Sequence, residues 1–453
     1  MKRRRLQIVL WIVASLTAMP WFSSDCSFQV AAQGSKGNPK KKSARPGTAR
    51  DKGKSKLVAI DLGDASWPQF LGPRRDNIAE ETGLLKKWPA AGPRLLTTLS
   101  GLGIGFSNVA LADGTVYTLG SQGDRELVLA LSLATGEQLW NCELAPTYQN
   151  GYGSGPRGTP TLDEDRLYAL GATGELVCLE RETGAGVWRK SLTREFGTKV
   201  PQWGLCESVL IDGDRLICTP GGSGATMVAL DKRTGDLLWK REASGNDGPA
   251  YASAIAIESH GVRQYVNFTS AGVISLRAED GLLLWRDDSS ANGTANCCAP
   301  LFDDGMVFTA SGYGAGGAML ALANNDDRTL ARKRYQTNKM KVHHGGMILY
   351  EGHVYGADDA ILTCLELKTG TVKWQNRSVG KCSLTCVQGL LIVRSEQGPV
   401  ALVAASPAGY KELGRFSPPN RSQSSAWTYP VVCGGKLFLR DQDLLQVYDL
   451  KGR

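Results

Sequence analysis

The stretch LVLALSLATGEQLW, residues 127–140, joins an apolar strand to a polar turn that ends in Gly136, with Trp140 four residues later. Alternating apolar positions predict a β-strand, and a glycine in the turn supplies the positive φ of a hairpin with a bulge. The same phrase recurs at residues 174–188, 226–239, 272–285 and 361–374. We predict a structural role for the Trp of each copy, filling the space between neighbouring sheets: Trp140, Trp188, Trp239, Trp285 and Trp374.

The spacing of these tryptophans defines the repeat. Successive spacings are 48, 51, 46 and 89 residues, so one unit has lost its Trp. That unit is GAMLALANNDDRTL, residues 317–330, in which Asn-Asn-Asp-Asp replaces the Thr-Gly turn. A second strand-turn-strand phrase, such as LADGTVYTLG from Leu111, precedes each copy and makes four strands per unit. A period of about 45 residues predicts a propeller blade; a solenoid is the alternative, but the chain has no capping repeat.

Counting these units predicts an all-β, eight-bladed β-propeller of four-stranded antiparallel blades. The eighth unit lacks its outermost strand, and PRLLTTLSG, residues 93–101, is the unassigned segment that can supply it. The N-terminal strand would then complete the last blade and close the ring. Thr97 and Thr98 stand where a Trp is expected, so we expect looser packing at this seam. The predicted blades are 106–140, 157–188, 203–239, 251–285, 296–331, 343–374, 381–414 and 427–450.

The N-terminus predicts export. Four basic residues, 2–5, precede an apolar run of about 14 residues, short of the roughly 20 that a membrane span needs. We predict a signal peptide at 1–32, a basic disordered linker at 33–56 and the propeller domain at 57–453; an uncleaved anchor is the alternative. Asp25 before Cys26 argues against a lipoprotein site. We therefore expect a monomer that is periplasmic or in the cell envelope, with no membrane span after leader removal.

The net charge of +8 does not belong to the predicted domain. Residues 1–56 hold 13 of the 52 Lys and Arg residues and 2 of the 44 Asp and Glu residues, which leaves 39 basic and 42 acidic residues. Nucleic-acid binding by the propeller therefore has no electrostatic support.

At these repeats the chain resembles the pyrroloquinoline-quinone (PQQ) repeat family, whose blade consensus is a Gly-x-Leu-x-Ala-Leu-Asp strand, a Thr-Gly turn and a Trp. The segments WPQFLGPRRDNIAEETGLL (67–85) and FLRDQDLLQVYDL (438–450) resemble exported bacterial propellers of that type. The family includes quinoprotein alcohol dehydrogenases and the propeller lipoprotein of the outer-membrane β-barrel assembly machine. The resemblance implies the fold, and it leaves the activity open.

Loops that lead into the innermost strands of a propeller converge at one mouth of its central channel. We predict a ligand-binding site there, with Phe106 at the entry of the first blade. The alternative is that these side chains cap strands and fill the channel. The predicted set from the other blades is Arg157, Trp203, Glu207, Tyr251, Cys297, Cys298, His343, His344, Lys381 and Trp427.

The resemblance also allows this chain's residues to be compared with those that bind a quinone cofactor in the family. Cys297-Cys298 resembles the vicinal pair that packs against PQQ in quinoprotein alcohol dehydrogenases, but Ala299 and Pro300 follow it instead of that family's Asp and Asn-Arg-Gly segment. No residue matches the family's calcium ligands. An exported protein could bridge Cys382 and Cys386 or pair Cys382 with a neighbour, and His343-His344 lacks a third partner for a metal.

No G-x-S-x-G, HExxH, Walker or EF-hand motif occurs. We therefore expect a non-catalytic binding or scaffold module that holds an envelope protein or peptide, with no assigned catalytic residue, metal or cofactor. The alternative is a PQQ- and calcium-dependent quinoprotein dehydrogenase that oxidises an alcohol or sugar.

Overall fold

The computed structural model describes residues 60–243, 247–325 and 328–452. The signal peptide and the linker predicted at 1–56 lie outside these residues. The described chain is almost entirely β, with one short helix, α1 (Leu192–Phe196). No helix in the described part of the chain is long and apolar enough to cross a membrane.

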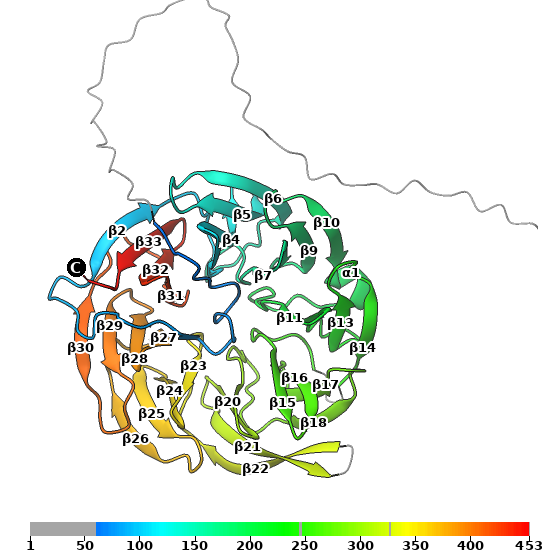
Figure 1. Ribbon diagram of the computed structural model, residues 1–453. Coiled ribbons are helices and arrows are strands. Elements are labelled where there is room, and N and C mark those ends of the chain that lie inside the picture. Colours follow the sequence, from blue (N-terminus) through cyan, green and yellow to red (C-terminus); the bar gives the residue numbers. More distant parts are fainter. Residues whose placement is uncertain (1–59, 244–246, 326–327, 453) are drawn as a thin grey trace, which may run out of the picture. The chain divides into compact units, whose positions relative to one another are not determined.

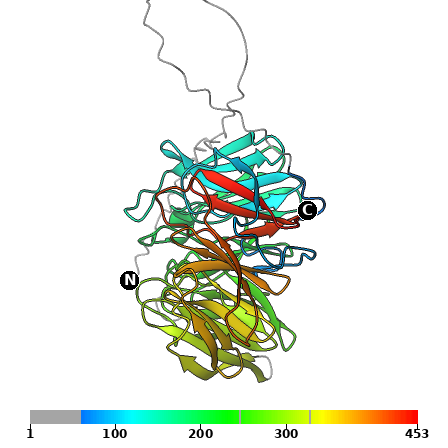
Figure 2. The same ribbon diagram turned by 90° about the vertical axis from the view of Figure 1, so that its left-hand side faces the viewer.

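Eight antiparallel sheets of four strands form the blades, as predicted, and they are arranged in a ring (Figure 1). Figure 2 shows the same blades from the side. The strands of the first four blades are β3 (Ala110–Ala112), β4 (Thr115–Gln122), β5 (Arg125–Ser132), β6 (Gln138–Pro146); β7 (Thr161–Asp163), β8 (Arg166–Leu170), β9 (Glu175–Glu180), β10 (Gly186–Ser191); β11 (Leu210–Asp212), β12 (Arg215–Cys218), β13 (Met227–Asp231), β14 (Leu237–Arg241); and β15 (Ile255–Ser259), β16 (Val262–Phe268), β17 (Val273–Arg277), β18 (Leu283–Asp287).

The next three blades follow the same order. Their strands are β19 (Leu301–Asp303), β20 (Met306–Ser311), β21 (Gly316–Asn325), β22 (Arg328–Thr337); β23 (Met347–Tyr350), β24 (His353–Asp358), β25 (Ile361–Glu366), β26 (Val372–Asn376); and β27 (Cys382–Val387), β28 (Leu390–Ser395), β29 (Val400–Ala404), β30 (Glu412–Phe416).

The eighth blade joins the two ends of the described chain. Its strands β31 (Val431–Cys433), β32 (Lys436–Asp441) and β33 (Leu444–Asp449) are completed by β2 (Arg94–Leu99), which pairs antiparallel with β33. The predicted closing segment is therefore confirmed. Leu99, Val116 and Leu445 share one buried apolar cluster across this seam. The looser packing expected beside Thr97 and Thr98 stays a prediction.

The repeated tryptophans fasten each blade to the next one along the chain. The Trp140 ring lies against Gly184 in the turn of the second blade, where an added Cβ would be 2.5 Å from a ring carbon. Its indole N–H donates to the Arg181 carbonyl oxygen at 3.1 Å. Trp188 contacts Gly235 and Trp239 contacts Gly281 in the same way. The turn glycine thus has a second use, since it makes room for the preceding blade's Trp.

Other interfaces depart from this pattern. Tyr335 takes the Trp position of the fifth blade and contacts Gly370 of the sixth. The fifth blade offers no turn glycine, and the Trp285 indole donates instead to Gln264 of its own blade at 3.2 Å. In the seventh blade Gly414 holds the Trp position, and Trp88 from the N-terminal segment packs against it.

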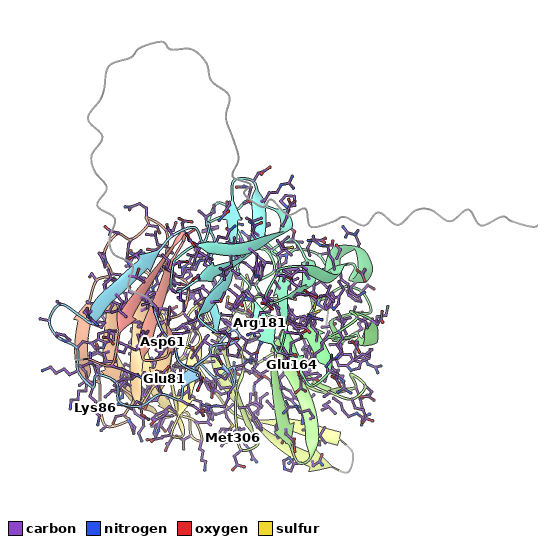
Figure 3. All side chains as sticks on the ribbon, turned by 45° about the horizontal axis from the view of Figure 1, so that its top comes forward. Asp61, Glu81, Lys86, Glu164, Arg181 and Met306 are labelled. Atoms are coloured by element: carbon purple, nitrogen blue, oxygen red, sulfur yellow. The ribbon has the colours of Figure 1, made fainter. Side chains whose placement is uncertain are left out.

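The segment before β2 crosses the centre of the ring (Figure 1). Its strand β1 (Ile78–Ala79) adds a fifth, parallel strand to the inner edge of the seventh blade, an addition that the sequence did not predict. On the opposite side, the Arg75 guanidinium donates to the carbonyls of Ser208 and Val209 at 2.7 and 3.0 Å. Glu81, labelled in Figure 3, accepts a hydrogen bond from the backbone N–H of Gly435. We name residues 60–92 the central segment.

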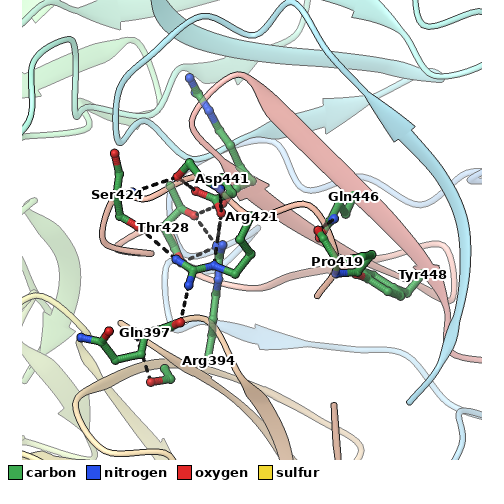
Figure 4. A network of polar contacts seen from close by, with 12 residues as sticks. Arg394, Gln397, Pro419, Arg421, Ser424, Thr428, Asp441, Gln446 and Tyr448 are labelled. Carbon is green, nitrogen blue, oxygen red and sulfur yellow. Dashed lines mark hydrogen bonds and ion pairs between the residues drawn. The ribbon is translucent and has the colours of Figure 1, made fainter. Parts of the chain in front are cut away.

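Buried arginines bind the last blades together. Arg394 donates to the Thr428 hydroxyl at 2.6 Å and to the Arg440 carbonyl at 2.7 Å, within the network of Figure 4. Arg440 in turn reaches the first blade, donating to the carbonyls of Ser107 and Leu119 at 2.8 and 2.7 Å. Both side chains are about 1% exposed. Their charges are solvated by backbone dipoles that only the closed ring brings together.

Candidate functional site

A cavity of about 620 Å³ opens where the chain enters the inner strands. Phe70 of the central segment forms part of its wall, so the segment that crosses the ring also bounds the cavity. We name it the channel-mouth cavity. Of the predicted site residues, those that line it are Phe106, Arg157, Trp203, Tyr251, Cys297, His343, His344, Lys381 and Trp427.

Two predicted residues lie behind the wall. Glu207 is 4% exposed, and its carboxylate accepts hydrogen bonds from the Thr219 backbone N–H at 2.7 Å and the Thr219 hydroxyl at 3.0 Å. Burial raises the pKa of Glu207 to about 7, against the opposing effect of these bonds and of the Arg75 charge. Cys298 is 1% exposed, with its thiol 3.9 Å from the His343 carbonyl oxygen. Adjacent residues of a strand entry face opposite ways, which explains why Cys297 lines the cavity and Cys298 does not.

Other residues of the wall were not predicted from the sequence. Cys206 lies six residues before the end of β11, the same offset that separates Arg157 from the end of β7 and Cys297 from the end of β19. Counting back from the strand end would therefore have found it. Four further residues line the cavity from segments to which this count does not apply: Phe70, Tyr152, Tyr313 and Glu396.

Aromatic side chains form two facing groups in the cavity. Trp203 lies edge-on to Tyr251, with ring centroids 5.4 Å apart, and 6.0 Å from Tyr152. In the other group, Trp427 is 4.7 Å from Phe106 and 5.7 Å from His344. The first group comes from the second, third and fourth blades, and the second from the first, sixth and eighth. The walls are therefore largely flat and apolar.

Two cations lie among these rings. The Arg157 guanidinium sits 5.3 Å from the Phe106 ring centroid, and both of its terminal nitrogens donate at 2.6 Å to the carbonyls of Gly153 and Gly155. These bonds orient the guanidinium without neutralising it. Lys381 enters from the seventh blade, and among the described residues its ammonium has no hydrogen bond or ion pair. Glu396 is the carboxylate of the described cavity wall.

The two histidines have different surroundings. His343 Nε2 lies 3.0 Å from the Asp359 carboxylate, and its ring is edge-on to Tyr313. Burial, together with the charge of Lys381, lowers the pKa of His344 to about 3, so this imidazole is neutral at physiological pH. Its Nε2 is buried without a hydrogen-bond partner in the described structure, as is the Trp427 indole nitrogen. Buried polar atoms of this kind normally have a partner.

The cysteines are thiols. All ten in the described chain are free, including Cys382 and Cys386, so the bridge considered between those two does not form. Both lie in one strand, β27, four residues apart, where the backbone holds their side chains too far apart to join. Burial raises the pKa of Cys297 well above its usual value and that of Cys298 to about 12. Neither thiol is activated as a nucleophile.

The residues present do not fit a calcium-bound quinone. Calcium takes six to eight oxygen ligands, chiefly carboxylates, carbonyls and amides. The described wall of the cavity offers the Glu396 carboxylate and the amides of Asn108 and Gln202, and no aspartate. Nor do the described residues include a group of three or more His, Cys, Asp or Glu side chains able to hold a metal. No step is derived through this cofactor.

Eight four-stranded blades around an aromatic central cavity define a β-propeller of the quinoprotein type. Residues 124–376 match the family model described as outer membrane protein assembly factor BamB. This match covers more than half of the chain, and the chain belongs to that family.

Two curated relatives carry the same name. Outer membrane protein assembly factor BamB of Pseudomonas aeruginosa is 27% identical over 194 residues, which are 41% of this chain and 45% of that protein. BamB of Kangiella koreensis is 27% identical over 152 residues, 30% of this chain and 32% of that protein. The matched region thus spans less than half the length of either relative.

Solved structures show the same fold. BamB from Moraxella catarrhalis is 14% identical with a TM-score of 0.55, covering 79% of this chain and 100% of that chain. Quinohemoprotein alcohol dehydrogenase from Comamonas testosteroni is 10% identical with a TM-score of 0.55, covering 86% and 81%. The enzyme ADHIIG of Pseudomonas putida HK5 is 12% identical with a TM-score of 0.58, covering 86% and 80%. These likenesses concern the fold, which hosts binding proteins and enzymes alike.

Proposed function

We propose that this protein is a non-catalytic binding module of the cell envelope that acts in outer-membrane assembly and holds an envelope component in the channel-mouth cavity. The observation that carries the proposal is the cavity wall itself. Aromatic rings from six blades and two cations without a carboxylate partner face one closed space. Concave sites with flat apolar walls and a few oriented polar groups are typical of ligand binding.

The chemistry of the wall supports binding rather than catalysis. The thiol of Cys297 stays protonated at neutral pH, and the imidazole of His344 stays neutral below it. Glu207, the buried carboxyl group with a pKa near neutrality, lies behind the wall and is held by Thr219. A general base must reach the proton that it removes, and Glu207 does not line the cavity.

The family supports the location. The curated relatives are named outer membrane protein assembly factors, and the predicted signal peptide at 1–32 would bring this chain into the same compartment.

The test is capture from a cell-envelope extract by the immobilised mature protein. We expect a component that is retained by the wild type and lost from Trp203→Ala and Trp427→Ala, with Trp239→Ala on the perimeter as the matched control. Equal retention by all variants would contradict the proposal.

A second measurement addresses the dehydrogenase alternative. The mature protein is incubated with PQQ and Ca²⁺, and quinone absorbance and dye-linked oxidation of alcohols and sugars are followed. We expect neither quinone absorbance nor dye-linked oxidation above the level of a control protein that has no such cavity. Uptake with turnover would overturn the non-catalytic assignment.

A further inference from the structure

The channel-mouth cavity has a closed end. Phe70 lines it from the central segment, and the Phe70 ring is edge-on to Tyr429 with centroids 5.5 Å apart. The central segment is held on both sides of the ring, at blade three by Arg75 and at blade seven by β1. A linear chain therefore cannot thread through the ring at this point. A cavity of about 620 Å³ with such a floor accepts a chain end of one or two ring-sized units.

The charged groups of the cavity select an anion. Other buried or partly buried cations of the domain have a carboxylate partner, as in Lys232 with Asp163 at 2.6 Å and Lys341 with Asp358 at 3.1 Å. Arg157 has backbone carbonyls as partners, and each of its terminal nitrogens keeps a second hydrogen free. Lys381 keeps all three donors among the described residues. Each of these side chains can hold a ligand carboxylate by charge-assisted hydrogen bonds.

The unpartnered nitrogens select hydroxyl groups. The indole N–H of Trp427 can only donate, whereas neutral His344 has one donor and one acceptor nitrogen. The two ring centroids are 5.7 Å apart and both nitrogens are buried, so a single ligand unit bonds both once the two side chains turn these nitrogens toward the cavity. A hydroxyl group both donates and accepts, and a polyhydroxylated ring satisfies both sites at once. A flat aromatic acid has no hydroxyl hydrogen to offer the acceptor nitrogen.

The aromatic walls suit a saccharide ring. The face of an aromatic ring is electron-rich and attracts the weakly positive C–H face of a sugar. Beyond the cavity, Tyr152 and Tyr313 are 66% and 51% exposed, although large apolar side chains are usually covered. Both also line the cavity. They provide platforms for a second unit outside it.

We infer that the channel-mouth cavity binds the end of an acidic saccharide chain, whose uronic acid carboxylates are held by Arg157 and Lys381. This inference rests on the proposed function and names the class of envelope component. The sugar ring lies between the Trp203 and Trp427 groups, and its hydroxyls bond the nitrogens of His344 and Trp427. No bond is made or broken.

The test is calorimetric titration of the mature protein with trisaccharides of galacturonate, glucuronate and mannuronate. We expect binding of at least one, and at least ten-fold weaker binding of its trimethyl ester, which is neutral and of nearly the same shape. Arg157→Gln and Lys381→Met should each weaken binding at least ten-fold. The matched controls are Arg332→Gln and Lys373→Met, which change exposed residues of the outer strands β22 and β26.

Each outcome decides the inference. No binding of any acid trisaccharide, equal binding of the ester, or equal losses in the control variants would overturn it. A long polyuronate should bind in proportion to its chain ends, and binding in proportion to total uronate would refute capture of the terminal residue. If envelope capture still depends on Trp203 and Trp427 while every uronate fails, the ligand class is wrong and the binding module stands.

Discussion

The perimeter and the centre of this propeller are held together in different ways. On the perimeter, one contact is used repeatedly: a Trp ring of one blade lies against the turn glycine of the next, as in Trp140 with Gly184 and Trp188 with Gly235. In the centre, the contacts between distant segments do not repeat, and they are hydrogen bonds of buried charged groups such as Arg75, Arg394 and Arg440. Repeated contacts build a ring, and unique ones set where it closes and what its cavity contains.

The largest expected effect is in the centre, with Arg440→Met. Arg440 donates to the carbonyls of Ser107 and Leu119 across the seam between the last and first blades. Methionine fills the space but leaves these carbonyls buried without donors. We expect the free energy of unfolding to fall by about 3–5 kcal/mol. Urea unfolding followed by tryptophan fluorescence measures this free energy. A smaller loss of stability than in Trp140→Ala would show that the hydrogen bonds of Arg440 contribute less than the perimeter contact.

On the perimeter, Trp140→Ala should cost about 3 kcal/mol. Trp140 is 9% exposed, and the substitution opens a cavity against Gly184 and removes the bond to the Arg181 carbonyl. The same unfolding measurement applies. Leu139→Ala is the control, since its side chain is 55% exposed, and it should change stability by less than about 0.5 kcal/mol. A similar loss in both variants would mean that the interface contact is not the cause.

Glu207 should make the centre sensitive to pH. Burial raises its pKa to about 7 in the folded protein, above the value of about 4.3 for an unperturbed glutamate. The folded state then holds a proton that the unfolded state has lost. This stabilisation is full below about pH 4 and is lost as pH rises through about 7, for a total of at most about 4 kcal/mol. Glu207→Gln should flatten this part of the stability profile between pH 5 and 8, and an unchanged slope would assign it to another group.

The smallest expected effect is the difference in stability between alanine variants at two glycines with nearly the same backbone φ. Gly184 and Gly114 have φ of 74° and 69°, so alanine is strained at both. An added Cβ meets the Trp140 ring at 2.5 Å at position 184 and nothing within 4 Å at position 114. We expect Gly184→Ala to be more destabilising by about 1–2 kcal/mol. Equal melting temperatures for the two variants would show that the ring moves aside freely.

The repeat explains how much could be predicted from the sequence. Blade number, strand number per blade and closure by residues 93–101 follow from a phrase that recurs, because each copy must bury the same faces against the next. Nine of the eleven predicted site residues line one cavity for a related reason, since the loops that enter the inner strands occupy equivalent places in every blade.

The tertiary structure decided what does not repeat. The central segment crosses the ring and carries Phe70 into the cavity through single contacts of Arg75 and β1 with distant blades, and no local pattern predicts them. The sequence alone determined the ring, because strand period and turn chemistry are local. The contents of its centre depend on groups far apart in the chain, whose burial and charges exist only once the ring has closed.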